Sequence, residues 1–132
     1  EHASQDVILL VNLLHLIGDT ATQVLISESA KALAPGGIVI LYGPFMRSGV
    51  LTSAGDRAFH ESLREADPDM GYKDDTIVLN KLRAAGLTPM DRVEMPANNL
   101  TIIAQKNLTF DKLSHLRRRP LTRAEFTVPA AA

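Results

Sequence analysis

The sequence contains no cysteine, which excludes disulfides, cysteine nucleophiles and thiolate metal sites. This absence is compatible with a reducing compartment, and we expect a cytoplasmic protein. No apolar run approaches the roughly 20 residues of a membrane-spanning helix, so we predict no membrane association. The formal net charge is -1, and this balance favours neither nucleic acid nor an anionic membrane as a partner.

Signatures of several enzyme classes are also missing. No Gly-x-Ser-x-Gly elbow is present, so an α/β hydrolase would lack its nucleophile signature. No phosphate-binding loop occurs. The histidines lie far apart and do not have the spacing of zinc ligands, so we predict no metal site; they are His2, His15, His60 and His115.

Two continuous apolar runs, residues 6–11 and 38–42, are the most informative feature that is present. Both are rich in β-branched residues, which is typical of strands covered on two faces. Between them, residues 20–33 have the spacing of a helix, with Thr20 and Gln23 as a capping box and Pro35-Gly36-Gly37 as the stop. A parallel strand pair joined by a helix leaves a ligand-binding crevice at the carboxyl ends of its strands.

The rest of the chain predicts two more helices and a hairpin. Ser53 is expected to cap a helix that ends near residue 66, and a further helix spans 75–85. Strands over 90–95 and 100–105, joined by a short turn, predict an antiparallel hairpin. We expect residues 1–107 to form one domain and 108–132 a basic tail, either with a short helix over 113–119 or disordered.

This order of elements resembles the C-terminal half of a class I S-adenosylmethionine-dependent methyltransferase. The matched segments look like a little-characterised family of small methyltransferase-like proteins, and they include Asn12-Leu13-Leu14-His15, Tyr42-Gly43-Pro44-Phe45 and Met95-Pro96-Ala97-Asn98-Asn99. The resemblance covers about residues 6–106. It implies an α/β, partial Rossmann-like methyltransferase fold, with two parallel strands, a terminal antiparallel hairpin and helices on the faces.

The resemblance also implies roles for residues that follow the first strand. Asn12 and Leu13 would contact the cofactor S-adenosylmethionine, and His15 would be the base that removes a proton from the methyl acceptor, because histidine titrates near neutrality. The alternative is that Asn12 caps the strand end and that His15 is a packed, hydrogen-bonded ring.

Substrate-binding roles are implied for residues at the end of the second strand and in the hairpin turn. These are Tyr42, Gly43, Pro44, Phe45, Asn98 and Asn99. Gly43 permits close backbone approach and Pro44 stiffens the turn. Phe45 either walls a substrate pocket or packs on the following helix, and the two asparagines equally suit a purely structural turn.

The departure from the family pattern separates two hypotheses. An enzyme of this fold has three more strands, with a glycine-rich turn and an acidic residue that bind the cofactor, and this sequence has neither. We therefore expect an enzyme that is inactive as an isolated chain and acts on a small-molecule acceptor. The alternative is a non-catalytic interaction module that forms homo-oligomers through the edge of strand 6–11. An unrelated nucleotide-binding α/β protein fits the matched segments less well.

Overall fold

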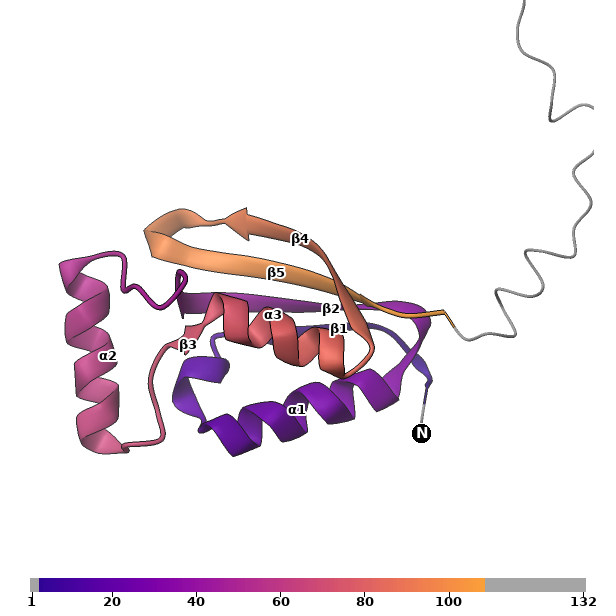
Figure 1. Ribbon diagram of the computed structural model, residues 1–132, viewed down its shortest axis with the longest axis horizontal. Helices are drawn as coiled ribbons and strands as arrows, with labels where there is room; N and C mark the ends of the chain where they lie inside the picture. Colours follow the sequence, from indigo (N-terminus) through magenta and orange to yellow (C-terminus); the bar gives the residue numbers. More distant parts are fainter. Residues whose placement is uncertain (1–2, 109–132) are drawn as a thin grey trace, which may run out of the picture.

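Residues 3–108 are described by a computed structural model, in which strands and helices alternate along the chain (Figure 1). The strands are β1 (Gln5–Val11), β2 (Leu33–Met46), β3 (Lys73–Asp74), β4 (Leu87–Glu94) and β5 (Asn99–Lys106). The helices are α1 (Asp19–Ala32), α2 (Ala54–Ala66) and α3 (Asp75–Ala84), with short 3-10 turns η1 (Leu14–Leu16) and η2 (Pro96–Asn98). The predicted helix over 113–119 lies outside the described residues.

The sheet has the order β1-β2-β5-β4, with the short β3 pairing with the end of β2. Strands β1 and β2 are parallel, with Val7 opposite Ile38 and Val11 opposite Tyr42. Strand β5 is antiparallel to both β2 and β4. The predicted parallel pair and antiparallel hairpin are therefore confirmed, and the chain has an α/β, partial Rossmann-like fold.

The hydrophobic core lies between the sheet and helices α1 and α3, which run along the same face (Figure 1). Alternate residues of the strands point toward these helices, because successive side chains of a strand alternate between faces. Fully buried members of this core include Ile26, Leu41, Leu82, Leu100 and Ile102. The helix-facing side of the sheet is therefore complete within the chain.

The opposite face of β1 is open to solvent. Val7, Leu9 and Val11 are 54%, 60% and 49% exposed. The strand register continues this row onto half-buried Ile38, Ile40 and Tyr42 of β2, and then onto Ile103 of β5. Parallel strands are normally covered on both faces. In the described fold, this apolar row and the unpaired edge of β1 are both left uncovered.

Two predicted boundaries differ from the structure. The capping box at Thr20 is wrong, because Gly18 is the N-cap residue of α1 and no side chain caps this end. Strand β2 begins at Leu33, so Pro35-Gly36-Gly37 lies inside it; an irregularity between Gln5 and Val7 of β1 accommodates the extra residues. Gly37 is required there, since a Cβ would lie 3.0 Å from the Gln5 carbonyl oxygen.

Other local predictions are confirmed. The Ser53 side chain accepts a hydrogen bond from the backbone of Asp56 and so caps α2. Gly86 follows α3 with a φ of +81°, as a helix-terminating glycine should. Within residues 3–108, no helix has the length and apolar character to cross a membrane.

Candidate functional site

The carboxyl ends of β1 and β2 lie side by side, as the sequence predicted. The backbone N–H of Asn12 donates to the Tyr42 carbonyl oxygen over 2.8 Å. A Cβ on Gly43 would lie 3.4 Å from Oδ1 of Asn12 and 3.6 Å from its Cα. Gly43 thus lets Asn12 approach the end of β2 closely, and the two strand ends form one rim.

Asn12 adopts a left-handed backbone conformation, with a φ of +52°, and its side chain is exposed. Asparagine tolerates this region better than most residues, at a modest cost in free energy. The next residue, Leu13, is half-buried and packs against the hydrophobic core. The turn after β1 therefore presents Asn12 to solvent and anchors itself through Leu13.

His15 is in η1 and is only 7% exposed. Its ring meets the rings of Phe59 and Tyr72 edge-on, at centroid distances of 5.8 and 6.4 Å. Burial, and secondarily the ammonium group of Lys73, lowers the pKa of His15 below its ordinary value. Among residues 3–108 its ring nitrogens have no hydrogen-bond partner, so His15 is a packed, neutral imidazole with a free lone pair.

A cluster of four rings holds α2 against the turn that contains His15. It consists of His15, Phe59, His60 and Tyr72, with each contact close to perpendicular. The Tyr72 hydroxyl donates to Asp56 over 2.8 Å, and the Tyr72 backbone N–H donates to Nδ1 of His60 over 3.0 Å. Burial, reinforced by the Asp56 carboxylate, raises the pKa of Tyr72.

The predicted substrate residues of β2 divide between the two faces of the sheet. Tyr42 and Pro44 are half-buried and share the open face with Val11, whereas Phe45 is 3% exposed and belongs to the hydrophobic core. Phe45 lies at the same end of the sheet as His15, because it pairs with Lys73 of β3 and the nearby Gly71 N–H donates to the His15 carbonyl oxygen. The structure therefore brings Tyr42, Gly43 and Pro44 to the rim beside Asn12, and Phe45 beneath it.

The hairpin turn lies at the same end of the sheet, since Asn99 pairs with Pro44. Asn98 has a φ of +59°, and its amide donates to Asp56 over 3.2 Å. The Asn99 amide donates to the Pro96 carbonyl oxygen within the turn. Both asparagines thus have structural contacts, and that of Asn98 joins the hairpin to the start of α2.

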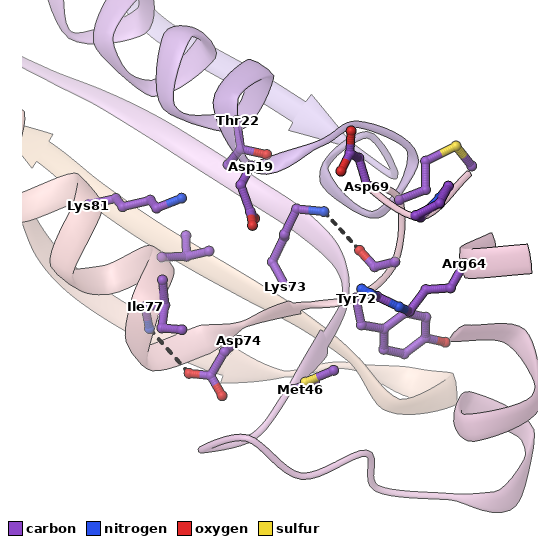
Figure 2. Close-up of a pocket in the computed structure, with 14 residues that line it drawn as sticks. Asp19, Thr22, Met46, Arg64, Asp69, Tyr72, Lys73, Asp74, Ile77 and Lys81 are labelled. Carbon is purple, nitrogen blue, oxygen red and sulfur yellow. Dashed lines mark hydrogen bonds between the residues drawn. The ribbon is translucent and has the colours of Figure 1, made fainter. Parts of the chain in front are cut away.

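A cavity of about 450 Å³ adjoins this end of the sheet, and sequence reasoning did not predict it. It lies between α1, α3 and the segment 68–74 (Figure 2). Its charged lining residues are Asp19, Arg64, Asp69, Lys73, Asp74 and Lys81. Tyr72 also lines it, so the cavity borders the ring cluster that contains His15. No local sequence pattern marks these residues, because they come from separate elements.

Lys73 is the most enclosed charged group of the cavity, at 8% exposure. Its ammonium group donates to the carbonyl oxygens of Ile17 and Gly71, over 2.7 and 3.0 Å. Burial lowers the pKa of Lys73, and the carboxylate of Asp19 partly opposes this effect. In the described part of the chain, no cluster of histidine and acidic side chains could hold a metal ion.

The fold is similar to part of several solved methyltransferase structures. An O-methyltransferase family protein from Burkholderia thailandensis is 19% identical, with a TM-score of 0.68 over 78% of this chain and 30% of its own. An O-methyltransferase family 2 protein from Planctomyces limnophilus, in complex with apigenin, is 19% identical, with a TM-score of 0.69 over 76% of this chain and 30% of its own. Human N-acetylserotonin methyltransferase, in complex with SAM, is 18% identical, with a TM-score of 0.66 over 77% of this chain and 29% of its own.

These similarities show the fold, and they support the resemblance to the C-terminal part of a class I methyltransferase. The chain spans about 30% of the length of each of these structures. A family model matches the sequence over residues 1–106. The chain therefore belongs to the family described as "Protein of unknown function (DUF938)".

Proposed function

We propose that this chain provides the substrate-side half of a site for S-adenosylmethionine-dependent methyl transfer to a small-molecule acceptor. The observation that carries the proposal is the rim formed by the parallel strands β1 and β2, where Asn12 lies against Gly43 at the start of the turn that leads to His15. Ligands of α/β folds bind at the carboxyl ends of such strands. Solved O-methyltransferases share this arrangement of strands and helices.

The residues of this chain suit the side of the site that faces the methyl acceptor. When bound, S-adenosylmethionine supplies a methyl group on a sulfonium. Asn12 and Leu13 would hold the cofactor beside the rim, with the Asn12 amide as an orienting group. His15 would accept the proton of the methyl acceptor, because its lowered pKa leaves it neutral near pH 7.

The remaining predicted substrate residues would shape the rim. Tyr42, Gly43, Pro44 and Asn99 lie along it, and they would contact the acceptor directly. Phe45 and Asn98 would act by holding the rim in place, since Phe45 packs in the core and Asn98 donates to Asp56. The glycine-rich cradle of the cofactor is absent from this sequence, so turnover would require further strands paired with the free edge of β1.

Calorimetric titration with S-adenosylhomocysteine tests the cofactor part of this proposal. We expect saturable binding with one site per chain, weakened by the substitution Asn12→Ala and unaffected by Asn80→Ala, which removes an exposed amide on α3. Heat changes no larger than those of dilution, from a sample that unfolds cooperatively, would contradict cofactor binding by this chain. Equal affinities for both variants would place the ligand elsewhere.

A second function, as an oligomerising module, is favoured by the open surface of β1. A free strand edge beside exposed Val7, Leu9 and Val11 is suited to pairing with β1 of a second copy. The expected species is then a homodimer whose two sheets join edge to edge. A lysine on this row would oppose association, because pairing would bring the like charges of the two copies onto neighbouring strands.

Light scattering on the substitution Leu9→Lys tests the module. We expect the unmodified chain to be dimeric and Leu9→Lys to be monomeric, whereas Val24→Lys, on an exposed position of α1, should remain dimeric. A chain that stays monomeric at high concentration would rule out pairing through β1. A dimer that survives Leu9→Lys would have another interface.

A further inference from the structure

The cavity beside α1 and α3 separates groups of opposite charge without joining them. On the α1 side, Asp19 lies in the first turn of the helix, and Asp69 stands against its start, with Cβ 3.2 Å from a Cβ built on Gly18. On the opposite side, Lys81 comes from α3 (Figure 2). None of the three takes part in an ion pair or a side-chain hydrogen bond within residues 3–108.

The floor of the cavity is positive. The Lys73 ammonium group uses two of its three donors on the Ile17 and Gly71 carbonyl oxygens, and no carboxylate lies within ion-pair distance of it in the described residues. Asp74, the acid next to it in sequence, is occupied elsewhere, because its carboxylate caps α3 at Thr76 and Ile77. A buried charge that lacks an ionic partner is costly, so an anionic group bound here would be stabilised.

Apolar side chains form part of the remaining lining, beside Thr22, Arg64 and Tyr72. Met46, Ile77 and Val78 contribute to the wall formed by the end of β2 and the start of α3. Figure 2 shows Ile77 and Met46 on the Asp74 side of Lys73, away from Asp69. The cavity volume of about 450 Å³ falls within the range of small-molecule sites, which combine an apolar lining with a few placed polar groups.

From these observations we propose that the cavity binds a small zwitterion, an α-amino acid with an apolar side chain. Its carboxylate lies between Lys73 and Lys81, its ammonium group faces Asp19 and Asp69, and its side chain lies against Ile77 and Met46. Such a ligand neutralises both sides at once, whereas a simple anion meets the carboxylates of the lining and a simple cation meets Arg64 and the two lysines. The inference goes beyond the proposed methyl transfer and does not depend on it, because the binding groups all belong to this chain.

The test is an NMR titration of the ¹⁵N-labelled full chain with L-leucine and two analogues that each lack one charge. 4-Methylpentanoate lacks the ammonium group, and 3-methylbutylamine lacks the carboxylate. We expect L-leucine to give saturable shifts in the amides of Asp19, Gly71 and Lys73, and each analogue to bind about fivefold or more weakly, as expected for the loss of a charged hydrogen bond.

Two variants locate the site. Lys81→Met removes a cavity charge that makes no hydrogen bond within the described chain, and we expect about fivefold or more weakening of L-leucine binding. Lys31→Met, the matched control, removes an exposed lysine at the far end of α1 that pairs with Glu28, and binding should not change. Lys81 is used in place of Lys73, because Lys73 supports two backbone carbonyls and its loss would perturb folding.

Several outcomes would overturn the proposal. They are the absence of saturable shifts with L-leucine, equal affinity for either single-charge analogue, and equal effects of the two lysine variants. Shifts confined to the open face of β1 and β2 would also overturn it. None of these results depends on S-adenosylhomocysteine binding, so failure of this proposal and failure of the proposed function are separately visible.

Discussion

The substitution Tyr72→Phe should destabilise the protein while leaving its ring contacts in place. The Tyr72 hydroxyl donates to Asp56 over 2.8 Å in a buried setting. Asp56 also accepts from Thr52, Ser53 and Asn98, so this carboxylate joins α2, the segment after it and the hairpin turn. Burial alone would raise the pKa of Asp56, but these hydrogen bonds lower it below its ordinary value, and Asp56 is therefore charged at neutral pH.

The magnitude follows from the charge of the acceptor. A hydrogen bond to a charged group contributes about 1.5–3 kcal/mol to stability. Because Asp56 keeps its other donors, the loss in Tyr72→Phe should lie near the lower end of this range. The edge-to-face contacts with His15, Phe59 and His60 depend on the ring and should persist.

The assay is urea unfolding at pH 7, followed by far-UV circular dichroism. The matched control is Tyr42→Phe, since the hydroxyl of half-buried Tyr42 has no hydrogen bond within residues 3–108. We expect the free energy of unfolding to fall by about 1.5 kcal/mol in Tyr72→Phe and by less than about 0.5 kcal/mol in the control. Equal losses in the two variants would refute the role assigned to the Asp56 hydrogen bond.

Two further predictions concern the strand irregularity and the buried histidine. Gly37→Ala should lower the free energy of unfolding by about 1–3 kcal/mol in urea. The added Cβ would lie 2.9 Å from the Ala34 carbonyl oxygen and 3.0 Å from that of Gln5. The control is Gly55→Ala, where the added Cβ would meet only a side-chain atom at 3.8 Å. Because the pKa of His15 is lower in the folded state than its unfolded value of about 6.5, its contribution to stability is complete above that pH and is lost as the pH falls toward the folded pKa. The free energy of unfolding should therefore decline less steeply below pH 6.5 in His15→Phe than in the unmodified chain, and parallel curves would contradict this.

The parts of the fold that the sequence predicted are those with local or periodic signals. Continuous apolar runs located β1 and the centre of β2, because runs of β-branched and other apolar residues favour strands. Ser53 and Gly86 marked a helix start and a helix end through chemistry that acts within one turn. The strand ends at Asn12 and Gly43 then followed from the direction of the two strands.

One of the two errors comes from a contact that is distant in sequence, and the other concerns the local start of α1. Pro35-Gly36-Gly37 reads as a break, yet it lies within β2, because Leu33 pairs with Gln5 and the extra residues of β2 bulge opposite the step from Gln5 to Val7. Thr20 has a suitable side chain for capping, but the N-cap residue of α1 lies two positions earlier, at Gly18, whose carbonyl oxygen accepts a hydrogen bond from the Thr22 hydroxyl. Tertiary pairing outweighed local propensity in β2, whereas the contact at the start of α1 is local.

The sequence did not predict the cavity, because the residues that line it are distant from one another in the chain. Asp19, Lys73 and Lys81 belong to different elements, and each reads in sequence as an ordinary surface charge. Only the packing of α1 beside α3 brings them around one space and buries Lys73 to 8% exposure. The sequence predicted a rim at the ends of β1 and β2, but it held no signal for a second, charged space on the helix-covered side of the sheet.

The rim beside Asn12 and the charged cavity should respond to different substitutions, because only the rim borders an unpaired strand edge. The rim beside Asn12 is bordered by β1, whose outer edge is unpaired, whereas the cavity walls all come from this chain. Leu9→Lys should therefore change the oligomeric state without changing the affinity for L-leucine, and Lys81→Met should do the reverse. Light scattering and the NMR titration on the same two samples measure both effects. If Leu9→Lys also weakened L-leucine binding about fivefold, the cavity would depend on a partner at β1, and the two surfaces would form a single site.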